Sequence, residues 1–278
     1  MTEATADPTW VCVSCRARVP MAEDVCTSCG RPFGEGLAEP EQKATTRRDL
    51  ARWGWVLREL VFLNLLFILW RIVGRISVFH EAGAFGRGRW LWHAERVLHL
   101  PSEAALQRQI LGHETWDRIA NGYYAWAHIV VFAVALLWLM LRHRDVYPRW
   151  RNLVVVFTAI SLLIGLMPTA PPRLIPRFGM VDLAARYHQS VYEGLGKGIT
   201  DQLSAMPSVH VGWAVIVAWA VIAVSKSRWR WLALAHPLLT TYFIVVTANH
   251  YWLDGVAAIA LLALVYFGIR RWRPSLVP

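Results

Sequence analysis

Residues 209–225, VHVGWAVIVAWAVIAVS, form an apolar run that contains no Asp, Glu, Lys or Arg. An apolar stretch of about 20 residues crosses the hydrocarbon core of a bilayer as a helix, and this run lies at the short end of that range. A helix is expected because an open sheet would leave polar backbone groups exposed to lipid. The run therefore predicts a membrane-spanning helix.

Five further apolar segments accompany this run. The six together lie near residues 56–73, 122–141, 152–168, 209–225, 231–248 and 251–269. The 278-residue chain is 56% hydrophobic and has 16 Trp, which is more apolar than a typical soluble domain. We therefore expect an all-α integral membrane fold, with a six-transmembrane-helix bundle in residues 47–278. The connection at 89–120 mixes Trp and Leu with charges, which predicts amphipathic helices at the membrane interface.

The basic residues indicate how such a bundle is oriented. They form four clusters, which are Arg47, Arg48 and Arg52; Arg142, Arg144, Arg149 and Arg151; Lys226, Arg228 and Arg230; and Arg270, Arg271 and Arg273. Six spans place all four clusters on one side, and the positive-inside rule makes that side cytoplasmic. We expect a multi-pass plasma membrane protein with cytoplasmic N and C termini. The net charge of +10 then reflects these loops, and nucleic acid is a disfavoured partner.

Two Cys-x-x-Cys pairs separated by ten residues begin the chain. This spacing is typical of four thiolates around a tetrahedral zinc ion, and a metal can hold together a peptide too short to bury a core. We expect a zinc ribbon in residues 1–30 with structural zinc, a linker in 31–46, and a cytoplasmic protein as the candidate partner of the ribbon. Two disulfides or a redox pair are the alternatives. The cysteines are Cys12, Cys15, Cys26 and Cys29.

Ionisable residues near the outer ends of the predicted spans are the candidates for chemistry, since such residues are costly inside a membrane. His250 and Asp254 are four residues apart and would share one helix face. A carboxylate on one ring nitrogen fixes the histidine tautomer and leaves the other nitrogen as a nucleophile or base. The alternative is a structural polar pair inside the membrane, in which the two side chains only satisfy each other's hydrogen bonds.

A second group points to phosphate binding. Ser208 is placed to cap the helix that follows it, and a helix start presents N–H groups that suit a phosphate. His210 could then protonate a leaving oxygen, and Arg173 could grip phosphate oxygens. The alternatives are a capping serine with a solvated histidine, and an interfacial arginine, with Arg177 as a rival in the same loop.

These segments resemble a known family. The sequences Pro-Ser-Val-His at 207–210 and His-Tyr-Trp-Leu-Asp at 250–254 resemble the second and third signature motifs of the type-2 phosphatidic acid phosphatase superfamily. Asn-His-Tyr at 249–251 and Pro-Pro-Arg at 171–173 are more similar to its inositol phosphorylceramide synthase-related branch. The resemblance covers about residues 95–270.

The resemblance implies six helices and metal-independent hydrolysis or transfer of a phosphoric ester through a phosphohistidine, with no cofactor for catalysis. The substrate would be a lipid or polyprenyl phosphate, bound at the extracytoplasmic face. The implied roles are His250 as the nucleophile, Asp254 as its partner, His210 as the acid, and Ser208 and Arg173 as phosphate ligands.

The chain also departs from the superfamily pattern. The first motif usually opens with a lysine seven residues before its arginine, and that position is Leu166. The third motif usually has Ser-Arg before its histidine, and those positions are Ile244 and Val245. The missing charge could come from the outer loop, through Arg177, Arg186 or Lys197. His128 also resembles the branch and would approach the head group, with a buried structural histidine as the alternative.

Several functions stay open at this point. A phosphatase releases inorganic phosphate, whereas an inositol-phosphate-type transferase moves a head group to an alcohol, and the same residues serve both. Two histidines and a carboxylate could instead bind a metal. A transporter or a non-catalytic scaffold would also fit a polytopic chain, although no inverted repeat is visible.

Overall fold

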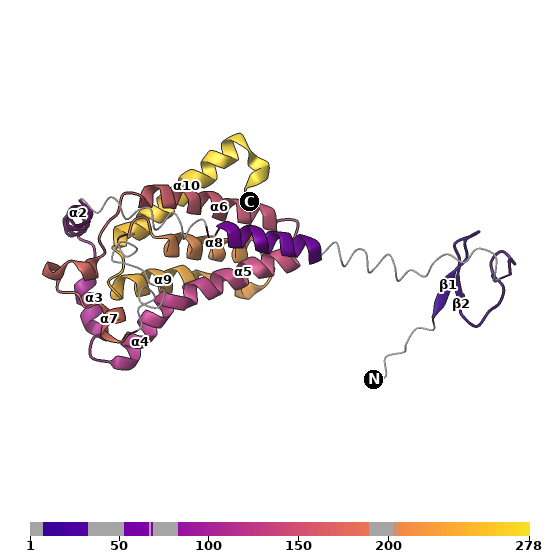
Figure 1. Cartoon of the computed structure of the whole chain (residues 1–278), viewed down its shortest axis with the longest axis horizontal. Helices are drawn as coiled ribbons and strands as arrows, with labels where there is room; N and C mark the ends of the chain where they lie inside the picture. Colours follow the sequence, from indigo (N-terminus) through magenta and orange to yellow (C-terminus); the bar gives the residue numbers. More distant parts are fainter. Residues whose placement is uncertain (1–7, 33–52, 67, 69–82, 189–202, 204) are drawn as a thin grey trace. The chain divides into compact units, whose positions relative to one another are not determined.

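The computed structural model describes residues 8–32, 53–66, 68, 83–188, 203 and 205–278 (Figure 1). The chain divides into two compact units, Met1–Leu65 and Leu66–Pro278, and each is described by itself. Of the predicted linker 31–46, all but the first two residues lie outside the described part. The predicted first span, 56–73, is helical as far as residue 66, and most of its remainder also lies outside.

The N-terminal unit contains a small hairpin. Strand β1 (Thr9–Val11) pairs antiparallel with β2 (Arg18–Pro20), in the register that places Trp10 opposite Val19. Buried Val19 packs with Cys12 and Cys26. So small a core buries little apolar surface, which agrees with a fold that relies on its cysteines.

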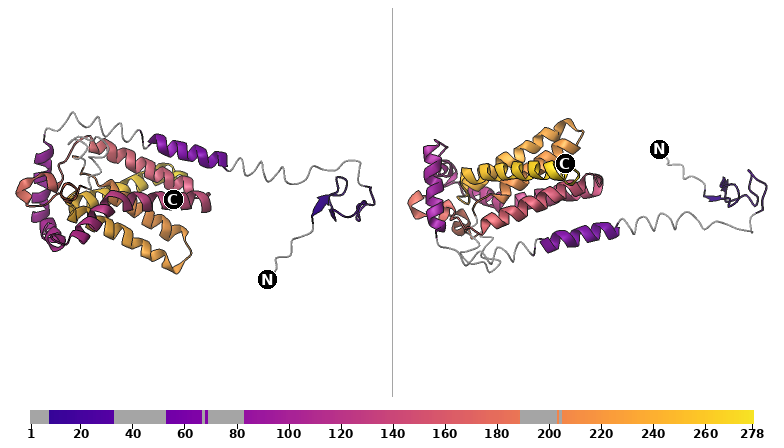
Figure 2. Two further views of the ribbon diagram at one scale, coloured as in Figure 1. Left: turned by 60° about the horizontal axis from the view of Figure 1, so that its bottom comes forward. Right: turned by 90° about the horizontal axis from the view of Figure 1, so that it is seen from above.

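Five long helices of the second unit lie side by side (Figures 1 and 2). They are α5 (His128–Arg142), α6 (Tyr147–Gly165), α8 (Val209–Val224), α9 (Ala235–Val246) and α10 (Trp252–Trp272). Helix α8 packs against the other four. Its Gly212 makes the contact with α6 close, because a methyl group there would overlap the Phe157 ring.

Four further helices of the described residues gather at one end of these five (Figure 1). They are α2 (Ala84–Val97), α3 (Glu103–Ile110), α4 (Glu114–Gly122) and α7 (Leu183–Arg186). Helix α2 contacts α10, and α3 contacts α9. Ser102 caps α3 by accepting the Ala105 N–H. The helices predicted within 89–120 are therefore present, and they cover the end of the bundle where α10 begins.

Two helices in the described part of the chain are long and apolar enough to cross a membrane, Glu114–Arg142 and Trp252–Trp272, and Val209–Val224 is a shorter apolar helix. The first is continuous because a π-helix, Tyr123–Ala127, joins α4 to α5, so the helix starts before the predicted boundary at 122. The predicted segment 231–248 also differs, since the 3₁₀ helix Arg228–Leu234 precedes α9. Six spans remain a prediction.

Candidate active site

His250 lies in the short connection between α9 and α10. The chain reverses there through Ala248, which has a left-handed φ of 57°, and the Asn249 and His250 N–H groups both donate to the Ile244 carbonyl. A left-handed non-glycine residue persists only where its surroundings enforce it, and such residues cluster at functional sites. The turn fixes the backbone of His250 just before the N-terminal end of α10.

The Nδ1 atom of His250 faces two oxygens, and both partners are buried. It lies 2.7 Å from the Ala205 carbonyl oxygen and 3.1 Å from Asp254 Oδ2. The predicted contact with Asp254 is present, but the reason given for it was wrong. His250 precedes the helix, whose N-cap is Tyr251, so the two do not share a helix face. Asp254 instead accepts the Tyr251 N–H at 2.9 Å and reaches back to the ring.

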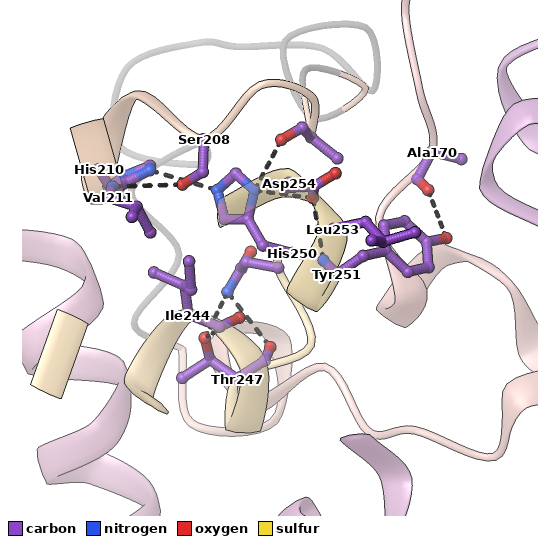
Figure 3. Close-up of polar contacts among 12 residues, drawn as sticks. Ala170, Ser208, His210, Val211, Ile244, Thr247, His250, Tyr251, Leu253 and Asp254 are labelled. Carbon is purple, nitrogen blue, oxygen red and sulfur yellow. Dashed lines mark hydrogen bonds and ion pairs between the residues drawn. The ribbon is translucent and has the colours of Figure 1, made fainter. Parts of the chain in front are cut away.

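The other ring nitrogen of His250 faces His210. Its Nε2 lies 3.2 Å from His210 Nδ1, and the ring centroids are 5.2 Å apart (Figure 3). A carbonyl oxygen can only accept a hydrogen bond, so His250 Nδ1 carries a proton. In the neutral form of His250, Nε2 is then the acceptor and His210 Nδ1 is the donor. The structure therefore places His250 Nε2, the nitrogen that holds the lone pair in this tautomer, beside His210.

Ser208 is the N-cap of α8, as predicted. Its Oγ accepts the Val211 N–H at 3.4 Å, and its side chain is fully buried. Its backbone N–H donates to the Asp254 carbonyl at 3.2 Å. Ser208 therefore ties the start of α8 to the start of α10, which holds the two histidines of the site on connected elements.

Arg173 lies in the 3₁₀ helix Pro172–Leu174 and is buried, with 2% of its side chain exposed. Its backbone N–H donates to the Ala248 carbonyl. The guanidinium Nε donates to Asn249 Oδ1 at 2.8 Å, and Nη1 lies 3.4 Å from Asp182 Oδ2. Arg173 is therefore buried and packs on the turn that carries His250.

The outer-loop cations that were expected to supply the missing motif charge are arranged differently from Arg173. Arg177 and Arg186 are exposed, and Arg186 lies over the ring of Tyr187. Lys197 lies outside the described residues. Arg173 is thus the buried arginine of the loop, and its burial beside Asn249 sets it apart from the other two.

Some contributions to the site carry no signal in the sequence. Ala205 acts through its carbonyl, so its side chain gives no indication of its position. Tyr251 is buried and donates from its hydroxyl to the Ala170 carbonyl at 2.8 Å. Gly88 makes room for this contact, since a side chain there would meet the Tyr251 hydroxyl at 2.8 Å. Asn249 belongs to the Asn-His-Tyr segment at 249–251, but its hydrogen bond to Arg173 was not predicted.

Comparison with known proteins agrees with this geometry. A model of the PAP2 superfamily, the type-2 phosphatidic acid phosphatases, matches residues 89–268, which is more than half of the chain. The chain belongs to the PAP2 superfamily. Membership implies phosphatase or phosphotransferase activity on lipid phosphates, and together with the apolar helices it indicates a membrane protein. No curated protein and no solved structure matches the chain.

The residues at the positions that depart from the PAP2 motifs differ in their burial. Ile244 and Val245 are almost fully buried in α9, where an unpaired cation would be costly. Leu166, at the end of α6, is exposed. The apolar residues at these two positions of α9 therefore suit their buried surroundings.

His128 lies against the site rather than apart from it. Its ring meets the His210 ring edge-on, with centroids 4.3 Å apart, and Tyr124 also contacts His210 at 5.1 Å. His128 directly follows the π-helix Tyr123–Ala127, a feature frequent at functional sites. Its position fits the second prediction, a buried histidine, and its approach to a head group stays a prediction.

The cysteines of the N-terminal unit form a metal-ligand group. Their Sγ atoms all lie within 4.8 Å of one another, with Cys12 to Cys29 at 3.6 Å and Cys15 to Cys26 at 3.5 Å. Tetrahedral bonds of about 2.3 Å would place the sulfurs about 3.8 Å apart. The turns also match, since Arg16 and Gly30 have positive φ and donate to the Cys12 and Cys26 carbonyls. The residues fit a metal ion.

Proposed function

We propose that the chain is a membrane lipid-phosphate phosphatase or phosphotransferase that forms a phosphohistidine on His250. The observation that carries this proposal is the contact between His250 Nδ1 and the Ala205 carbonyl at 2.7 Å. Because that carbonyl fixes the tautomer, the lone pair of Nε2 points to the side where His210 lies. A nucleophile so oriented needs no further proton transfer before attack.

In the proposed reaction, His250 Nε2 attacks phosphorus and the bond to the leaving oxygen breaks. His210, as the imidazolium, gives its Nδ1 proton to that oxygen and becomes neutral, and Asp254 stabilises the His250 imidazole as positive charge develops on it. Water or an alcohol then attacks the phosphohistidine, and His210 takes its proton. The 3.2 Å between the two rings is too short to hold a phosphorus centre, so substrate binding must move the rings apart.

Arg173 and Ser208 are the proposed phosphate ligands. Arg173 supplies a buried positive charge packed against the turn that carries His250, through its contacts with Ala248 and Asn249. Ser208 supplies the start of α8, whose N–H groups and dipole favour an anion. The bilayer presents the lipid or polyprenyl part of the substrate. The proposed reaction uses no cofactor.

The test uses purified full-length protein in bilayer vesicles, a panel of lipid and polyprenyl phosphates, and a chelator in the assay. Wild type is expected to release phosphate or transfer a head group, and His250→Ala to lose at least about 1000-fold, since it lacks the nucleophile. His143→Ala, which alters the end of α5, is the matched control and should stay near wild type. Full activity in His250→Ala would refute the mechanism.

Trapping the intermediate gives an independent readout. Radiolabelled lipid phosphate followed by rapid quenching should yield an acid-labile, alkali-stable phosphoprotein in wild type and in His143→Ala, and none in His250→Ala. The product then separates the two reactions, because inorganic phosphate indicates hydrolysis and a new phosphodiester indicates an inositol-phosphate-type head-group transfer.

We also propose that the cysteine group binds zinc as a structural ion, with a cytoplasmic protein as partner of the ribbon. The sulfur distances and the two matched turns support zinc. Metal analysis of the full chain should find about one zinc per protein, and Cys15→Ser should lower that content. Two disulfides in place of metal would leave no titratable thiols and would contradict the proposal.

For the membrane, we propose a multi-pass plasma membrane protein with cytoplasmic termini and an extracytoplasmic site. The basic clusters at Arg142–Arg151 and Arg270–Arg273 support it, since they lie at the junction of α5 with α6 and at the C-terminal end of α10, away from His250. A C-terminal reporter that is active only in the cytoplasm tests the orientation, and its inactivity in intact cells would reverse it.

A further inference from the structure

Two glutamates lie buried beside the start of α10. Glu95 is in α2 and Glu103 opens α3, and neither side chain is exposed. Buried carboxylates are costly unless they are paired or protonated. Neither residue belongs to the motifs of the superfamily quoted above, so their burial needs its own explanation.

Glu95 makes one contact that reaches the site. Its Oε1 accepts the Leu253 N–H at 2.8 Å. Leu253 is in the first turn of α10, where backbone N–H groups have no partner within the helix, and it directly precedes Asp254. The contact therefore fixes the helix turn from which Asp254 reaches His250 Nδ1.

The charges around Glu95 do not balance if every carboxyl group is ionised. Arg96 Nη2 lies 2.9 Å from Glu103 Oε2 and 4.0 Å from Glu95 Oε2. Asp254 and Tyr251 also face the pair, and Asp254 itself contacts His250. Arg96 thus lies against two buried carboxyl groups.

A shared proton resolves this imbalance. Within the described residues, Glu95 Oε2 and Glu103 Oε1 are buried and have no hydrogen-bond partner when both groups are carboxylates. The two carboxyl groups lie within hydrogen-bonding reach of each other, so a proton on one of them can be donated to the other. In agreement, burial and a hydrogen bond to the Glu103 carboxyl raise the pKa of Glu95, which lies outside the membrane-spanning helices, to about 9.

We propose that Glu95 is a positioning residue that shares one proton with Glu103 and holds the first turn of α10, and with it Asp254, against the nucleophile His250. The kinetic part of this inference rests on the proposed function, whereas the shared proton does not. Glu95 acts through Leu253 and Asp254 and does not touch the substrate.

The kinetic test compares Glu95→Gln with Glu95→Ala. Gln keeps an oxygen for the Leu253 N–H and is neutral, like the protonated acid, so its kcat is expected within about threefold of wild type. Ala leaves the N–H unpaired and is expected to lower kcat at least about tenfold with little change in KM. Glu114→Ala, an exposed glutamate of α4, is the control. A slow Glu95→Gln, or a fast Glu95→Ala, would overturn the positioning role.

The proton itself is read by infrared spectroscopy of the full chain at neutral pH. Wild type and Glu114→Gln should show the C=O stretch of a buried protonated carboxyl group, and Glu95→Gln should lose it. An unchanged band in Glu95→Gln would overturn the shared proton. If wild type turns over no lipid phosphate, the proposed function fails, and the infrared result still decides the protonation of Glu95.

Discussion

Replacing Asn249 with Ala tests how the site holds its arginine. The Asn249 side chain is buried, accepts the Arg173 Nε–H at 2.8 Å, and donates from Nδ2 to the Thr247 carbonyl at 3.2 Å and Oγ1 at 2.9 Å. The amide is therefore fixed on one side and orients the guanidinium on the other. Ala removes this acceptor, while the contact of Arg173 with Asp182 at 3.4 Å stays in place.

The magnitude follows from the kind of bond that is lost. A hydrogen bond to a charged group contributes about 1.5–3 kcal/mol, and each 1.36 kcal/mol corresponds to a factor of ten in rate. If Arg173 holds the phosphate in the transition state, Asn249→Ala should lower kcat/KM roughly 10- to 150-fold. The loss should be smaller than that of Arg173→Ala, since the guanidinium is still present.

Initial rates of phosphate release or head-group transfer in vesicles measure this change. The matched control is Asn152→Ala in α6, because Asn152 donates to the Leu276 carbonyl at 3.3 Å near the C terminus. That variant should keep kcat/KM within about twofold. An Asn249→Ala variant as active as the control, while Arg173→Ala is impaired, would refute the orienting role of Asn249.

Three other perturbations address the bundle, the buried acid and the ribbon. Gly212→Ala should destabilise the bundle by about 1–3 kcal/mol because its methyl group overlaps Phe157, measured as a lower midpoint of thermal inactivation in detergent, and an unchanged midpoint would contradict the packing. The pKa of Glu95 is raised on folding to about 9, so its stabilisation is complete below the unfolded pKa of about 4.3 and is lost as pH rises towards 9. Glu95→Gln should therefore flatten the decline of stability with pH, and parallel curves would argue against the shift. Cys15→Ser or strong chelation should unfold the ribbon, seen by proteolysis of the N-terminal unit, while lipid-phosphate turnover persists.

The helices could largely be predicted from the sequence, because apolar length is a strong signal. Their ends were less predictable. The helix that contains α5 starts at Glu114, since the polar turns of α4 continue through a π-helix that hydropathy does not reveal. Ser208 as the cap of α8 was predictable, because capping depends only on residues next to each other in the chain.

The site was predictable where local spacing determines it. Asp254 does contact His250, although through the capping of α10 and not through a shared helix face. The Ala205 carbonyl and Glu95 were not predictable, because their partners His250 and Leu253 lie far along the chain. A backbone carbonyl and a lone glutamate give no pattern until folding brings them to the start of α10.

The charge of the site also bears on the substrate. The PAP2 positions that usually hold cations are Leu166 and Val245 here, and the buried Arg173 has Asp182 beside it. A phosphate monoester carries close to two negative charges at neutral pH, whereas a diester carries one and needs less positive charge to bind. We therefore expect diesters to outperform monoesters with the same lipid chain in kcat/KM, which would favour head-group transfer. A clear preference for monoesters would show that the charge missing from these positions is supplied by another part of the chain.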